Sequence, residues 1–243
     1  MLEVLIIKNI IREGPGFIEE LLKERGTAYE VVDLSQGEAF PVLENYKALI
    51  LLGGPDSAND DNEKIRNELA RINEALDLGM PYLGICLGLQ ALVKAGGGAV
   101  VQNHTREIGF RDPEGEFFQI ELTDAGREDP LFKGLDDKTL PLLHLHGETV
   151  EITEEMTLLA SGKFCTNQVV RVGEKAYGIQ GHFELNDELF KSWLEEDGDL
   201  QNMDQKQLLA DFETLKTEYG YNEIHRQFFS NFLDLATTKR GLN

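Results

Sequence analysis

Long apolar runs, cysteine and basic residues are all scarce in this sequence of 243 residues. No apolar run approaches the roughly 18 residues that a membrane-spanning helix needs, so we expect no membrane association. The first ten residues carry one late Lys and no small-residue cleavage site, which favours a first strand over a signal peptide. The two cysteines, Cys86 and Cys165, form no disulfide framework and indicate a reducing, cytoplasmic setting.

Basic residues are fewer than acidic residues in this chain. Lys and Arg number 23 against 44 Asp and Glu, which gives a formal net charge of −21. Such a field repels phosphate backbones, so nucleic acid is not an expected partner. The acidic surplus is consistent both with a strongly charged surface and with a salt-adapted host. With 7 Pro, one Trp and no internal repeat, the chain lacks the signature of disorder or low complexity.

The first half of the chain alternates between short apolar segments and helical patterns. The apolar segments predict strands at residues 3–7, 29–34, 48–52 and 81–85, and the helical spacing predicts helices after Pro15 and at 59–78 and 87–95. Strands that alternate with helices in this way imply a parallel sheet covered on both faces.

The second half has a different pattern. Short strands are predicted at residues 117–122, 139–145, 157–161, 168–172 and 176–180, some of them antiparallel across a turn at Gly173. After Asn186 the chain turns helical, and the helices of residues 203–237 are expected to pack on the main sheet. The acidic stretch 195–204 is expected to be a surface loop or hinge.

The most informative segment is PYLGICLGLQ at residues 81–90, where Cys86 stands between a strand and a helix with Gly84 and Gly88 two residues away on either side. This is a G-x-nucleophile-x-G elbow with Cys in place of Ser. A strained turn projects the nucleophile outward, and the glycines let strand and helix pass without a Cβ clash. The thiol would lie at a helix N-terminus, whose dipole favours the thiolate. Taken alone, the pattern also fits a small buried Cys in a glycine-rich turn.

Two further segments favour the catalytic interpretation. The glycine pair Gly53-Gly54 follows a buried strand and could aim a backbone N–H at the elbow, where it would form an oxyanion hole with the N–H of Leu87. His182 and Glu184 are two residues apart after another strand, so an extended backbone puts them on one side. They would supply a base and its orienting carboxylate. A plain tight turn and a surface His near an unrelated Glu are the alternatives.

The remaining His and Cys residues carry weaker signals. His144 and His146 alternate along a strand and could be metal ligands, but no third ligand has suitable spacing, so no metal is predicted. Cys165 lacks an elbow and is expected to be a structural or surface thiol. His104 and His225 belong to no recognisable motif.

Taken together, GICLGLQ around Cys86, GGPDS at 53–57, HLHGE at 144–148 and GHFE at 181–184 resemble the class I glutamine amidotransferases. EGPG, EIGF, DPLF and CTNQ agree in order and spacing, and the chain looks most like stand-alone members similar to the glutaminase part of GMP synthase. The resemblance implies a flavodoxin-like α/β domain at residues 1–197, with a mostly parallel sheet and helices on both faces. Residues 198–243 would be a C-terminal helical extension packed on this domain.

The resemblance also implies roles for individual residues. Cys86 would be the nucleophile, His182 the base and Glu184 its orienter, with Gly54 and Leu87 as the oxyanion donors. The residues implied to contact the substrate are Gly53, Gln90, His146, Gly147 and Glu148.

The sequence departs from the family at two places. The family usually reads Phe-His-Pro-Glu where this chain has Gly181-His182-Phe183-Glu184, which removes a packing ring and frees the backbone between His and Glu. In the His-Trp-His-Gly-Asp segment, Leu145 and Glu148 replace Trp and Asp.

The sequence thus predicts an enzyme that needs no cofactor and hydrolyses the γ-amide of glutamine through a Cys thioester. It contains neither a Ser-Gly-Gly-x-Asp-Ser pyrophosphatase loop nor a Walker-type loop, so ammonia would pass to a separate synthase subunit or be released. Two alternatives stay open: a γ-glutamyl peptidase acting on amides such as glutathione, and a non-catalytic binding subunit of the same fold.

Overall fold

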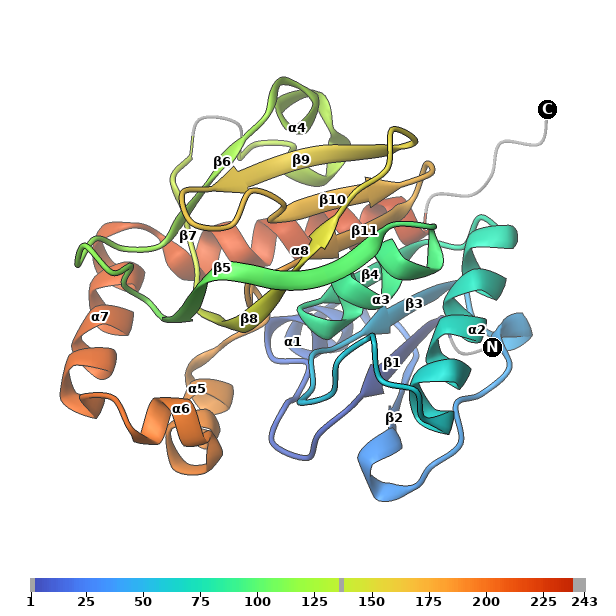
Figure 1. The fold of residues 1–243 in the computed structure, drawn as a ribbon, viewed down its shortest axis with the longest axis horizontal. Helices are drawn as coiled ribbons and strands as arrows, with labels where there is room; N and C mark the ends of the chain where they lie inside the picture. Colours follow the sequence, from blue (N-terminus) through green and yellow to red (C-terminus); the bar gives the residue numbers. More distant parts are fainter. Residues whose placement is uncertain (1–2, 136–137, 238–243) are drawn as a thin grey trace.

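The computed structural model describes residues 3–135 and 138–237, which are built around a nine-stranded sheet (Figure 1). The strands of this sheet are β1 Val4–Lys8, β2 Tyr29–Asp33, β3 Ala48–Leu51, β4 Tyr82–Ile85, β6 Gln119–Leu122, β7 Leu140–Pro141, β9 Met156–Gly162, β10 Val169–Val172 and β11 Ala176–Ile179. Their spatial order is β2-β1-β3-β4-β11-β10-β9-β6-β7.

Five neighbouring strands, β2-β1-β3-β4-β11, run parallel. This is the flavodoxin-like order 2-1-3-4-5 with β11 in the fifth place, which confirms the predicted fold class. The remaining strands pair antiparallel, and β10 turns into β11 at Gly173, as predicted.

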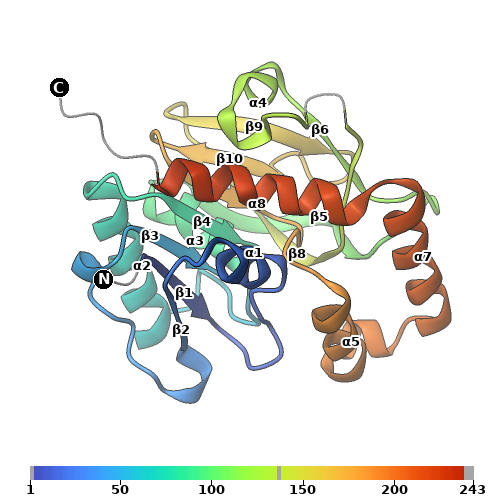
Figure 2. The same cartoon turned by 180° about the vertical axis from the view of Figure 1, so that it is seen from behind.

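Both faces of the parallel strands are buried, as their continuous apolar character requires. Along β1, Val4 and Ile6 enter one core cluster while Leu5 and Ile7 enter the other. Helices α1 Phe17–Arg25 and α8 Tyr221–Thr237 cover the first face, and helices α2 Glu63–Asp77 and α3 Leu87–Ala95 cover the second (Figures 1 and 2).

A separate two-stranded ribbon is formed by β5 Ala99–Gly109 and β8 His144–Glu151. No strand was predicted at β5, and the prediction of one continuous strand at residues 139–145 is wrong. That segment divides into β7, at the edge of the large sheet, and the start of β8 in the ribbon. The polar, half-exposed sequence of β5 explains why no apolar alternation marked it.

The remaining helices are α4 Asp124–Glu128, α5 Asp187–Glu196, α6 Gly198–Gln201 and α7 Gln205–Glu218. The expected loop at 195–204 instead contains α6 and the buried residues Asp197 and Leu200. Helix α8 packs against α1 and β7, whereas α7 lies beside the segment that follows β5, where Phe212 stacks on Phe110 with ring centroids 5.6 Å apart. No helix within residues 3–135 and 138–237 combines the length and hydropathy needed to cross a membrane.

Candidate active site

Cys86 occupies the strained turn between β4 and α3. Its φ of 52° makes it the one non-glycine residue with positive φ in the part of the chain that the structure describes. A Cβ on Gly84 would collide with the carbonyl oxygen of Gly88, and a Cβ on Gly88 would collide with that of Leu51. The elbow geometry predicted from the glycine spacing is therefore present, and it places the thiol at the N-terminus of α3.

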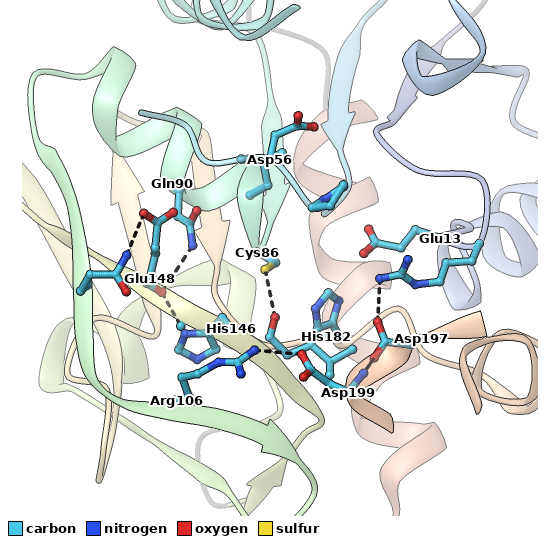
Figure 3. A pocket seen from close by; sticks show the side chains of 17 residues that line it. Glu13, Asp56, Cys86, Gln90, Arg106, His146, Glu148, His182, Asp197 and Asp199 are labelled. Atoms are coloured by element: carbon cyan, nitrogen blue, oxygen red, sulfur yellow. Dashed lines mark hydrogen bonds and ion pairs between the residues drawn. The ribbon is translucent and has the colours of Figure 1, made fainter. Parts of the chain in front are cut away.

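The thiol opens into a pocket of about 360 Å³ between the parallel sheet and the β5–β8 ribbon (Figure 3). Its lining comes from the loops after β1, β3 and β11, the elbow, the ribbon and the start of α6. The lining residues are Arg12, Glu13, Gly54, Pro55, Asp56, Cys86, Leu87, Gln90, Gln102, Arg106, Leu145, His146, Gly147, Glu148, His182, Asp197 and Asp199.

His182 and Glu184 form the pair that their spacing predicted. His182 Nδ1 lies 2.7 Å from Glu184 Oε1, and both side chains are buried. The Trp193 ring meets the imidazole edge to face, with centroids 4.8 Å apart. The backbone N–H of His182 donates a hydrogen bond to the Leu143 carbonyl oxygen at 2.9 Å. Ring and backbone of His182 are both fixed beside Cys86.

The charge of the imidazole is set by these neighbours. Burial alone lowers the pKa of His182, but the Glu184 carboxylate and the Cys86 sulfur outweigh burial and raise that pKa well above its usual value. The arrangement therefore favours the imidazolium form of His182 next to the Cys86 sulfur.

Gly54 and Leu87, predicted as oxyanion donors, both line the pocket. Leu87 is the first residue of α3, where backbone N–H groups lack an intrahelical partner. A Cβ on Gly54 would lie 2.5 Å from Asn9 Cβ, so only glycine fits there. Gly53, predicted to contact substrate, does not line the pocket and lies against the Glu13 carboxyl instead.

The predicted substrate contacts Gln90, His146, Gly147 and Glu148 lie together along the ribbon side of the pocket (Figure 3). Gln90 Nε2 is 3.4 Å from the Glu148 carbonyl oxygen. Sequence reasoning missed Gln180, whose Nε2 lies 3.6 Å from Cys86 Sγ. Its place two residues before His182, directly after β11, the strand next to β4, was the available signal.

His146 reaches the pocket from a buried polar cluster. Its Nε2 is 2.7 Å from Glu107 Oε2 and its Nδ1 is 2.9 Å from the Glu148 carbonyl oxygen. Cys165 lies close to both residues, and burial raises the pKa of its thiol to about 11. Sequence spacing offered no third ligand beside His144 and His146, whereas β5 and the loop after β9 bring Glu107 and Cys165 close to His146. That no metal binds here stays a prediction. The hydrogen bonds within the cluster hold residues 145–148 of β8 in place.

The departures at positions 181 and 183 are accommodated by neighbouring side chains. The Leu142 side chain fills the space beside Gly181, where any Cβ would collide with it. The Phe183 ring is fully buried and stacks on His225, with centroids 4.3 Å apart and planes at 15°. The backbone between His182 and Glu184 is therefore held by helix α8, in contrast to the freedom expected from the loss of proline.

Two buried acidic residues of the pocket also escaped sequence reasoning. Glu13 follows β1 in the EGPG segment, and Asp197 caps α6 while its Oδ2 accepts from Arg12 Nη2 at 2.6 Å. Burial raises the pKa of Glu13 to about 7. EGPG was recognised as part of the resemblance, but no chemistry was assigned to its carboxylate.

Comparison with known proteins agrees with this geometry. The sequence model of the family described as Glutamine amidotransferase class-I matches residues 16–198. The chain belongs to this family. As a class-I glutamine amidotransferase it shares the fold and the elbow-bearing region with its relatives, and the match ends where α6 begins.

Individual relatives cover the chain to different extents. The glutamine amidotransferase-like protein YfeJ of Salmonella typhimurium is 28% identical over 232 residues, which are 93% of each chain. A GMP synthase of Lactobacillus delbrueckii subsp. bulgaricus is 32% identical over 172 residues, 70% of this chain but only 28% of that synthase. The crystal structure of a glutamine amidotransferase from Thermotoga maritima superposes with a TM-score of 0.83 at 26% identity and covers 98% of this chain and 99% of that one.

Proposed function

We propose that this protein hydrolyses the γ-amide of glutamine to glutamate and ammonia through a thioester on Cys86. The observation that carries the proposal is the strained Cys86 turn beside the buried His182–Glu184 pair, in a pocket large enough for an amino acid. A nucleophile, a base and an orienting carboxylate are the groups that covalent amide hydrolysis needs.

The first half-reaction forms the thioester. The Cys86 thiolate attacks the γ-carbonyl carbon, and the N–H groups of Gly54 and Leu87 stabilise the negative charge on the carbonyl oxygen. As the C–N bond breaks, the His182 imidazolium gives its proton to the departing nitrogen, which leaves as ammonia. Neutral His182 then takes a proton from water, which attacks the thioester and releases glutamate and the thiolate.

The substrate's amino-acid end lies along the ribbon in this proposal. Gln90 and the His146–Glu148 backbone provide hydrogen-bonding groups on that side of Cys86. The relationship to GMP synthase, of which this chain matches only about a quarter, supports transfer of ammonia to a separate synthase subunit in the cytoplasm.

The test is glutamate release by the purified chain from glutamine and, separately, from glutathione, with Cys86→Ala as the control for contaminants. Slow hydrolysis of glutamine alone supports an amidotransferase that awaits its partner. Fast cleavage of glutathione would show that a γ-glutamyl amide, and not glutamine, is the substrate. Release from neither donor, together with no alkylation of Cys86 by a glutamine-derived chloroketone, would refute the catalytic function.

A further inference from the structure

The pocket has a second side that the proposed glutamyl contacts do not use. Gln90 and Glu148 lie on one side of Cys86, and Glu13, His182 and Asp197 lie on the other (Figure 3). In the proposed reaction the glutamyl group occupies the first side. The bond to nitrogen breaks toward His182, which must deliver a proton to that nitrogen.

Glu13 is an unusual group to find on the second side. Its side chain is 6% exposed, and its Oε2 accepts no hydrogen bond from any described residue. The carboxyl lies directly against Gly53, since a Cβ there would be 2.6 Å from Oε2. Buried carboxylates are normally paired or fully hydrogen-bonded, so a carboxyl left without a donor in the wall of a pocket is a place for a ligand's N–H.

The neighbouring charges do not neutralise this carboxyl. The nearby cations already have carboxylate partners: the His182 imidazolium lies 2.7 Å from Glu184 Oε1, and Arg12 Nη2 donates to Asp197 at 2.6 Å. Burial raises the pKa of Glu13 to about 7, His182 and Arg12 lower it, and Glu184 and Asp197 raise it. A buried carboxylate without a hydrogen-bond donor gains from a small cation or an N–H donor.

We propose that Glu13 is the subsite for the leaving nitrogen, where it accepts a hydrogen bond from the substrate amide and then holds the departing ammonia or ammonium ion. The inference rests on the proposed hydrolysis and adds the ligand class of its second product. The C–N bond breaks, His182 supplies the proton, and the ammonia so formed presents three N–H groups to the Glu13 oxygen. Small primary amines share this chemistry and would occupy the same place.

The test compares two donors that form the same Cys86 thioester. The leaving nitrogen of glutamine carries N–H groups before the bond breaks, whereas the leaving oxygen of the γ-methyl ester of glutamate carries no hydrogen until it departs as methanol. Glu13→Ala should lower kcat/KM for glutamine by about 10- to 100-fold, the usual worth of a hydrogen bond to a charged group. The same variant should leave kcat/KM for the ester within about threefold. Glu68→Gln is the matched control, since Glu68 is also a buried carboxyl but lies outside the pocket lining, and it should leave both values unchanged.

A second readout does not depend on turnover. Ammonium chloride should slow alkylation of Cys86 by iodoacetamide in the wild type, and sodium chloride at equal ionic strength should not. Glu13→Ala should abolish this protection. Equal losses on amide and ester, or protection by ammonium that survives Glu13→Ala, would overturn the amine subsite. A wild type that hydrolyses neither donor would refute the proposed function, and the ammonium protection would then decide the subsite by itself.

Discussion

Replacement of Phe183 with Ala should separate the role of helix α8 in activity from its role in stability. The ring is fully buried between His225 and Phe228, with centroid distances of 4.3 and 4.8 Å. A Phe→Ala change at such a site costs about 3–5 kcal/mol of unfolding free energy. Of this, about 0.5–1.5 kcal/mol reflects the geometry of each aromatic pair.

The loss should extend to catalysis because the ring belongs to the residue between His182 and Glu184. The Tyr221 hydroxyl, also on α8, lies 3.5 Å from the His182 carbonyl oxygen, so the helix contacts this turn at two points. A displacement of about 1 Å between reacting groups costs on the order of 100-fold in rate. We therefore expect kcat for glutamine to fall by about 100-fold in Phe183→Ala, with a much smaller change in KM.

The assay pairs urea denaturation with glutamate release, at a temperature where every variant is folded. Phe132→Ala is the matched control, because Phe132 is equally buried and packs on Phe228 at 5.6 Å but belongs to a different segment. It should lose similar stability and keep near wild-type kcat. If both variants lose activity to the same extent, or if Phe183→Ala keeps full activity, the positioning role of α8 is refuted.

Three further results are expected. A glutamine-derived chloroketone should modify Cys86 and leave Cys165 unmodified by peptide mass mapping, because Cys165 is buried and burial raises its pKa to about 11. His182→Ala should reduce kcat by several orders of magnitude, nearly as much as Cys86→Ala. Glu184→Gln keeps a hydrogen-bond partner for the imidazole, so it should reduce kcat less. A His182→Ala enzyme with near wild-type turnover would contradict the role assigned to His182. Burial raises the pKa of Glu68 from 4.5 to about 7, so the folded protein binds more protons than the unfolded chain between these values and stability falls as pH rises through that window. Glu68→Gln should therefore gain up to about 3 kcal/mol of unfolding free energy at pH 8 and much less at pH 5, and equal gains at both values in urea titrations would contradict the raised pKa.

The parts of the fold that the sequence predicted are those specified by local patterns. Continuous apolar runs located the parallel strands, and helical spacing located α2 and α3. The elbow at Cys86 followed from two glycines at fixed offsets, since no other residue fits at Gly84 or Gly88. The His182–Glu184 pair followed from the period of an extended chain.

The parts that were missed depend on contacts between distant segments. Strand β5 is polar because one of its faces lines the pocket or meets solvent, so it has no apolar alternation to read. Glu107 joins His146 through pairing of β5 with β8, and their 39-residue separation gives no local signal. The predicted loop at 195–204 became part of the pocket because Asp197 pairs with Arg12, 185 residues away.

The departures from the family pattern show how one local change requires another elsewhere. Without proline between His182 and Glu184, the turn needs a different constraint, and Phe183 supplies it by inserting its ring against His225 of α8. His225 can take that place because burial lowers its pKa to about 3 and keeps it neutral, with its Nε2 donating to the Pro141 carbonyl at 3.0 Å. A charged ring there would face the full cost of burial without a counter-ion. The aromatic residues of α8 and the replaced turn therefore act together, so restoring proline at position 183 would remove the ring that now holds the turn and leave a gap against the helix.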